Sequence, residues 1–207
     1  MRIIVDAFGG DNAPLEVIKG AQLARQEYQV EISLSGDRKE IEQCAKENGL
    51  SLDGIEILDA QGMIPVEADP TTLLKEYENC SMAVGLRALK EGKGDAFVSA
   101  GSTGALVVGA SLIVKRLKGV RRTAISTVIP NEKGCFMLMD SGANAECNSD
   151  MLLQFGMMGS VYMNKIVGVS DPRVGLLNIG TEETKGVDYL WATAMWRSAM
   201  ASPEILP

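Results

Sequence analysis

The stretch RIIVDAFGGDNAP, residues 2–14, joins an apolar run to a glycine turn and then to a proline. The apolar run is typical of a β-strand, and Pro14 suits the first turn of a helix because that position needs no backbone N–H donor. Between them, Gly9 and Gly10 allow backbone conformations that other residues rarely adopt. The stretch therefore predicts a strand, a loop and a helix in succession, which is the repeating unit of an α/β protein.

The same alternation continues along the chain, where short β-rich apolar runs are mostly separated by segments with helical periodicity. It predicts a parallel or mixed sheet covered by helices on both faces. The expected strands are Arg2–Asp6, Val30–Ser35, Ile55–Leu58, Ala96–Ser99, Ala124–Ile129, Phe136–Met139 and Val174–Asn178. The expected helices are Pro14–Tyr28, Arg38–Asn48, Thr72–Glu91, Thr103–Leu117 and Ser149–Lys165.

The composition favours one large domain that does not bind nucleic acid. The chain has 207 residues, 46% of them hydrophobic, which is enough to bury a sizeable core. Its 27 acidic and 20 basic residues give a net charge of -7, which argues against broad attraction to nucleic acid or to an anionic membrane surface. The apolar run at the start is too short for a signal peptide or a membrane span. We therefore expect a cytoplasmic protein.

Two residue types limit the chemistry. The chain contains no histidine, which removes the usual general base and the Ser-His-Asp triad. Its four cysteines lie far apart and form no C-x-x-C pair, so we expect reduced thiols and neither a zinc site nor a disulfide framework. Catalysis must then rest on carboxylates, lysine, hydroxyls and backbone amides.

Two loops after predicted strands have the small, polar residues of a ligand site. In residues 6–14 a phosphate or ribose contact is one interpretation, and a tight turn with Asp11 or Asn12 capping the helix is the other. In SAGSTGA, residues 99–105, Ser102 and Thr103 offer hydroxyls beside helix N–H groups, which predicts an anion cradle or a capped helix. Neither loop is a Walker A or G-x-G-x-x-G motif, so ATP and NAD are disfavoured.

Two further loops have a similar character. In NIGTEETKG, residues 178–186, Lys185 can neutralise a phosphate, although a solvated charged turn explains the same cluster. In DSGANAEC, residues 140–147, Asp140 and Asn144 are candidate orienting groups, although turn chemistry alone also favours Gly142 and Asn144.

One basic segment stands out against the acidic background. It is expected either to receive an acidic protein surface or to form a solvated helix end, where cations favour the helix dipole. Its basic residues are Lys115, Arg116, Lys118, Arg121 and Arg122.

Five segments in order resemble the signature segments of the PlsX-type phosphate acyltransferase family. They are VDAFGGDNAP at 5–14, SAGSTGAL at 99–106, MDSGANAEC at 139–147, LLQFGMMGSVYM at 152–163 and PRVGLLNIGTEETKG at 172–186. Two positions depart from the family pattern: Asn12 stands where many relatives have histidine, and Ser102 where asparagine is usual. Both substitutions retain hydrogen-bonding capacity.

The resemblance implies a three-layer α/β/α fold with a mostly parallel sheet, similar to phosphotransacetylases and isocitrate dehydrogenases. It implies transfer of a long-chain acyl group from acyl carrier protein to inorganic phosphate, without metal or organic cofactor. It also implies a homodimer in the cytoplasm with a peripheral relation to the inner face of the membrane, where a membrane glycerol-phosphate acyltransferase is the expected partner.

The resemblance covers most of residues 1–186, and the sequence departs from the family after Gly186. We therefore expect residues 1–186 to form the N-terminal part of the family fold, incomplete at its C-terminus, and residues 187–207 to form an atypical tail. Three alternatives remain open: acyl transfer between phosphate and coenzyme A, a non-catalytic truncated fragment, and a dinucleotide-binding oxidoreductase of related fold.

Within this frame we predict that Ser102, Thr103 and Lys185 hold phosphate during catalysis. Backbone amides of the same two loops are expected to stabilise the charge that develops on the reacting oxygen. The full set predicted to line the substrate cleft is Asp6, Gly9, Gly10, Asp11, Asn12, Gly101, Gly104, Asp140, Asn144, Gly180 and Thr181.

Overall fold

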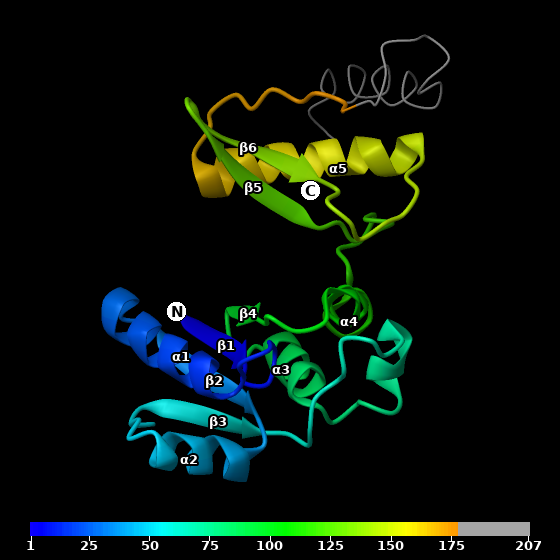
Figure 1. Cartoon of the computed structure of the whole chain (residues 1–207). Helices are drawn as coiled ribbons and strands as arrows, with labels where there is room; N and C mark the ends of the chain where they lie inside the picture. The colour runs from blue at the N-terminus through cyan, green and yellow to red at the C-terminus, as the bar shows by residue number, and fades with distance from the viewer. Residues whose placement is uncertain (178–207) are drawn as a thin grey trace. The chain divides into compact units, whose positions relative to one another are not determined.

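The structure is a computed structural model that describes residues 1–177. The chain divides into two compact units after Leu117 (Figure 1). None of the helices among the described residues is long and apolar enough to cross a membrane. The assignment of residues 1–186 to a single family-like domain stays a prediction.

The first unit is built on a four-stranded parallel sheet. Its strands are β1 (Arg2–Asp6), β2 (Glu31–Gly36), β3 (Ile55–Asp59) and β4 (Ala96–Val98), in the order β3-β2-β1-β4. Ile4 lies opposite Ser33 on one side and Phe97 on the other, which fixes the register of the three central strands. Successive strands add outward from β1 to β3, and the chain then crosses back to place β4 on the free side of β1. The direction of winding therefore reverses between β1 and β4.

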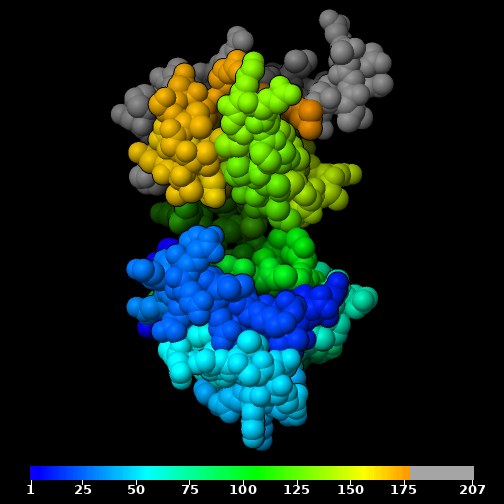
Figure 2. All heavy atoms as spheres, turned by 60° about the vertical axis from the view of Figure 1, so that its left-hand side comes forward, coloured from blue at the N-terminus to red at the C-terminus, as the bar shows by residue number. Residues whose placement is uncertain are grey.

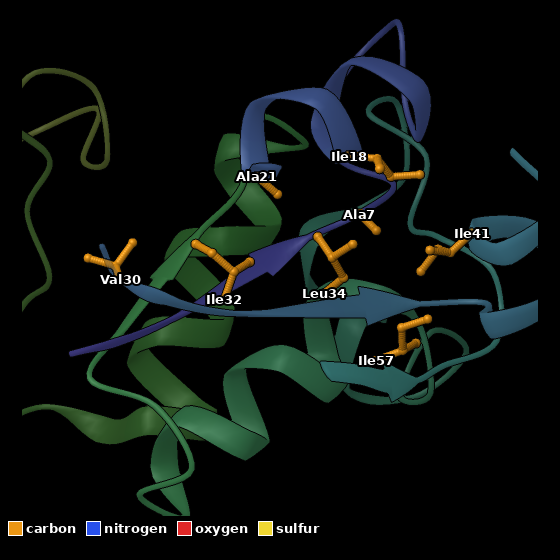
Figure 3. Packing of buried hydrophobic residues seen from close by; sticks show 8 residues of the cluster. All are labelled: Ala7, Ile18, Ala21, Val30, Ile32, Leu34, Ile41 and Ile57. Atoms are coloured by element: carbon orange, nitrogen blue, oxygen red, sulfur yellow. The ribbon is translucent and has the colours of Figure 1, made fainter. Parts of the chain in front are cut away.

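Helices α1 (Leu15–Tyr28) and α2 (Arg38–Glu47) cover one face of this sheet. The core of this face consists of Ala7, Ile18, Ala21, Val30, Ile32, Leu34, Ile41 and Ile57, each at most 9% exposed (Figure 3). In β2, Ile32 and Leu34 alternate with Ser33 and Ser35, as the period of a strand requires. The space-filling view shows the chain of α1 and α2, coloured blue to cyan, at the surface of this unit (Figure 2).

Helices α3 (Ser81–Lys90) and α4 (Thr103–Gly109) pack with a second core. A methyl group on Gly85 of α3 would lie 2.8 Å from the Ser35 hydroxyl and would also collide with Phe97, so this glycine lets the helix approach the sheet closely. Because Ser35 points away from the core of α1 and α2, α3 covers the opposite face. The predicted parallel sheet with helices on both faces is confirmed.

One predicted helix is wrong. The helix expected over Thr72–Glu91 is instead the 3-10 helix η1 (Pro70–Leu74), a turn, and then α3. The reason is tertiary: Asn79 accepts a hydrogen bond from the amide of Gln61, and the amide of Ser81 donates to the carbonyl of Gly62. These contacts hold the residues between η1 and α3 in a turn. The helix expected over Thr103–Leu117 is α4 followed by the π-helical segment η2 (Ala110–Lys115).

The second unit contains a hairpin and a helix. Strands β5 (Ser126–Asn131) and β6 (Gly134–Met139) pair antiparallel. Helix α5 (Ser149–Tyr162) is followed by the π-helical segment η3 (Met163–Val167) and begins at an Asn148 cap, whose side chain accepts from the amide of Met151 at 3.0 Å. The strand expected over residues 174–178 is not present in its described part, because residues 174–177 pair with no strand of the described chain.

Candidate functional site

The loops that follow β1 and β4 meet at the carboxyl edge of the first unit's sheet. Asp6 ends β1 and Ser99 directly follows β4, and the Ser99 hydroxyl donates to Asp6 Oδ2 at 2.7 Å across 93 residues of sequence. This is also the point at which the winding of the sheet reverses. Ligands of open α/β sheets bind in the crevice outside the strands at such a switch point. The pair therefore marks the candidate site.

Asp6 holds the two loops together. Its side chain is buried, and its second carboxylate oxygen accepts from the amide of Phe8 at 3.2 Å. Both oxygens therefore have donors within the protein, which satisfies a charged group that would otherwise be costly to bury. The arrangement fits an orienting role for Asp6 rather than direct contact with an anion.

Gly9 lies in the centre of this arrangement, where only a hydrogen fits. A methyl group on Gly9 would lie 2.7 Å from the Ser99 hydroxyl, 2.9 Å from Asp6 Oδ2 and 2.9 Å from the amide nitrogen of Gly101. Gly10 has a φ of 114°, in the region that favours glycine. The two positions thus require glycine for different reasons: Gly9 because the two loops approach closely, and Gly10 because of its backbone conformation.

The loop between β4 and α4 presents donors. The amide of Gly101 donates back to the Ser99 hydroxyl at 3.1 Å, and the buried Ser102 caps α4 by accepting from the amide of Ala105 at 3.3 Å. The Ser102 hydroxyl keeps its own hydrogen for a further acceptor. The amides of Thr103 and Gly104 find no acceptor among the described residues. These groups can together receive an anion, and the capped helix that sequence reasoning gave as the alternative is present as well.

Asp11 and Asn12 are exposed in the turn that follows Gly10. Neither caps the next helix, because α1 has Pro14 at its cap position and no side-chain cap hydrogen bond. The interpretation of these side chains as helix caps is therefore wrong. Both stay free to contact a ligand at the loop.

Asp140 and Asn144 organise a loop of the second unit. The Asp140 carboxylate accepts from the amides of Ile125 at 2.7 Å, Ala143 at 3.2 Å and Asn144 at 2.7 Å. Burial raises the pKa of Asp140, but these bonds and one from the Asn144 side chain outweigh it and leave the pKa below its usual value. Burial and the nearby Asp140 charge raise the pKa of the Cys147 thiol. The prediction that Asp140 and Asn144 share a cleft with Asp6 stays a prediction.

The predicted basic segment crosses the boundary between the two units. All five of its basic residues are exposed: Lys115 and Arg116 lie just before the end of the first unit at Leu117, and Lys118, Arg121 and Arg122 belong to the start of the second. Arg121 pairs with Asp150 at 2.6 Å. The carrier-protein patch stays a prediction.

Three predicted residues, Gly180, Thr181 and Lys185, lie outside the described residues. Sequence reasoning did not select Ser99, although it lies in the quoted loop. Its signal was its position: like Asp6, it stands where an apolar strand gives way to small residues. Within residues 1–177 no three potential metal-ligating side chains gather into one group.

Comparisons with known proteins agree on family and fold. The family model described as "Fatty acid synthesis protein" matches residues 1–205. The curated phosphate acyltransferase of Caldicellulosiruptor bescii is 48% identical over 189 residues, which cover 91% of this chain and 57% of that protein. The phosphate acyltransferase of Clostridium kluyveri is 42% identical over 186 residues, covering 90% and 56%. The chain thus spans a little over half the length of these relatives.

Two solved structures share the fold. The EutD phosphotransacetylase of Staphylococcus aureus has a TM-score of 0.69 at 21% identity, covering 97% of this chain and 64% of that one. A phosphotransacetylase of Streptococcus pyogenes has a TM-score of 0.70 at 18% identity, covering 98% and 66%. The predicted phosphotransacetylase-like α/β fold is confirmed.

Proposed function

This chain belongs to the fatty acid synthesis protein family, and from that membership we propose that it serves in acyl transfer to inorganic phosphate, with a long-chain acyl group on acyl carrier protein as the donor. The name phosphate acyltransferase, which the curated relatives carry, supports this reaction. The proposal concerns the whole protein, because the chain spans 57% of the first of these relatives.

The reaction suits a chain without histidine. A phosphate oxygen attacks the thioester carbonyl carbon, the carbon–sulfur bond breaks, and the products are an acyl phosphate and the carrier thiolate, which then takes up a proton from water. The leaving thiol has a pKa of about 8.5, so it departs without a strong acid. Phosphate is partly dianionic near neutral pH and attacks without a strong base. The protein then contributes mainly position and electrostatic stabilisation.

The observation that carries the proposal is the meeting of the two loops at the switch point. The Asp6–Ser99 bond holds them together, and the Ser102 hydroxyl and the amides of Thr103 and Gly104 offer donors to phosphate oxygens. Donors placed before the reaction stabilise the transition state without the reorganisation that water requires. We assign to Lys185 the positive charge that neutralises the bound phosphate.

The proposal extends to partners. Acyl carrier protein is expected to dock through its acidic surface on the exposed basic residues of the segment 115–122. We also propose that the protein is a homodimer in the cytoplasm. It would associate peripherally with the membrane and with a membrane glycerol-phosphate acyltransferase.

A second candidate is acyl transfer with coenzyme A, which the fold shared with phosphotransacetylases favours. A donor comparison separates the two. Acyl-phosphate formation is measured with palmitoyl-acyl carrier protein and with palmitoyl-coenzyme A, in this chain extended by the C-terminal region of the Caldicellulosiruptor bescii relative. Preference for the carrier protein supports the proposal, preference for coenzyme A supports the alternative, and no acyl phosphate from either donor contradicts both.

A further inference from the structure

The Ser99 hydroxyl is used twice at the switch point. It donates to Asp6 Oδ2 at 2.7 Å, and its oxygen accepts from the amide of Gly101 at 3.1 Å. The first bond joins the loop after β4 to the end of β1, and the second closes the turn of residues 99–101. One side chain thus sets both the place and the shape of the loop that precedes Ser102.

The surroundings leave Ser99 little freedom to move. A methyl group on Gly101 would lie 3.2 Å from the Ser99 hydroxyl and 3.3 Å from the Gly9 backbone, so the two loops are packed backbone to backbone. Asp6 is 3% exposed, which leaves little water to replace the Ser99 hydroxyl as a donor to its carboxylate. Without that donor the buried carboxylate has one unpaired oxygen.

An unpaired carboxylate at this place opposes anion binding. Asp6 and the turn of residues 99–101 lie at the same edge of the sheet, where a phosphate would add further negative charge. The Ser99 hydroxyl and the Phe8 amide each donate a hydrogen bond to one oxygen of the Asp6 carboxylate, so both oxygens have partners within the protein. Like charges brought close together in a partly dehydrated crevice repel each other more strongly than they do in water.

We propose that Ser99 is a positioning residue of the phosphate site: by bridging Asp6 and the Gly101 amide, it fixes the turn that presents phosphate donors and engages the carboxylate beside them. This inference rests on the proposed function, because it takes inorganic phosphate as the ligand. It predicts a loss of phosphate affinity in Ser99 variants that remain folded.

Calorimetric titration of the 207-residue chain with inorganic phosphate tests the inference. Ser99→Ala removes the hydroxyl, Ser99→Cys replaces it with a weak donor, and Ser99→Thr retains it. The matched control is Ser33→Ala, because Ser33 is also buried and also donates to a carboxylate, Glu56 at 3.0 Å, but belongs to the middle of β2. Thermal unfolding of each variant reports its stability.

We expect Ser99→Ala and Ser99→Cys to bind phosphate about tenfold more weakly, the loss of one hydrogen bond to a charged group. Ser99→Thr and Ser33→Ala should bind nearly as tightly as the unsubstituted chain. If Ser99→Ala does not fold, Ser99→Cys decides. Equal phosphate affinity in the unsubstituted chain and the folded Ser99 variants overturns the inference and leaves the proposed function intact. Absence of phosphate binding in the unsubstituted chain also overturns the inference, and the donor comparison in the extended chain decides the proposed function separately.

Discussion

Asn144 donates twice to Asp140 Oδ2, from its backbone amide at 2.7 Å and from its side-chain amide at 3.1 Å. The same carboxylate also accepts from the amides of Ile125 and Ala143. One ionised side chain therefore closes the loop after β6 and ties it to the segment before β5.

This arrangement predicts a pH-dependent contribution to stability. The pKa of Asp140 is lowered in the folded state, so its contribution is fully present above the unfolded pKa of about 3.9 and is lost as pH falls through the folded value. Asp140→Asn should lower the unfolding temperature at pH 7, and the difference from the unsubstituted chain should shrink as the pH is lowered from about 5 into the acid range. Thermal melts at a series of pH values measure this. A difference that stays constant with pH contradicts it.

Gly9→Ala should disrupt the candidate site, since the added methyl group collides with Ser99, Asp6 and the backbone of Gly101. Overpacking of this kind costs about 1–3 kcal/mol in stability, and we expect phosphate affinity to fall with it. The control is Gly20→Ala in α1, where the new methyl group meets nothing within 4 Å. That change should raise stability by about 0.5–1 kcal/mol through helix propensity. Denaturant unfolding compares them, and a Gly9→Ala variant as stable as the parent chain refutes the packing argument.

Ser102→Ala should destabilise α4 by about 0.5–2 kcal/mol, because the helix loses its cap. It should also weaken phosphate binding, since the hydroxyl is a proposed donor. Ser102→Asn retains a cap and a donor and should preserve both properties. Unfolding curves and phosphate titrations of the two variants provide the measurement. Unchanged phosphate affinity in Ser102→Ala would remove this hydroxyl from the site.

Lys185→Ala should lower turnover in the enzyme extended to family length by about 10²–10³, the usual effect of losing one group that stabilises developing charge. The measurement is the rate of acyl-phosphate formation at saturating palmitoyl-acyl carrier protein and phosphate, and the matched control is Lys165→Ala, on η3. Near-normal turnover in Lys185→Ala would exclude this lysine from the mechanism.

Sequence reasoning succeeded where the signal was local. The strand at Arg2–Asp6 agrees with β1 residue for residue, because the charged Asp6 and the glycine turn shortly after it end the apolar run. The helix expected over Thr72–Glu91 failed because contacts of Asn79 and Ser81 with the loop at residues 61–62 override the local helical periodicity. Such contacts between separate segments leave no periodic trace in the sequence.

The candidate site shows the same division. The small residues of both loops were visible in the sequence, and so was the cap at Ser102. The bond between Asp6 and Ser99 was not, because it depends on β4 pairing with β1 across 93 residues. Parallel neighbours are joined by long crossovers, so their adjacency follows from topology and not from local pattern.

The most direct test of the account is a phosphate titration of the isotope-labelled chain, followed by the backbone amide resonances in NMR, with potassium chloride of equal ionic strength as the reference. The account predicts that the amides of Gly101, Thr103 and Gly104 shift together and saturate by about 10 mM phosphate, tenfold above the usual upper range of KM. Resonances that stay fixed at these three positions throughout the titration would contradict the placement of phosphate at the switch point.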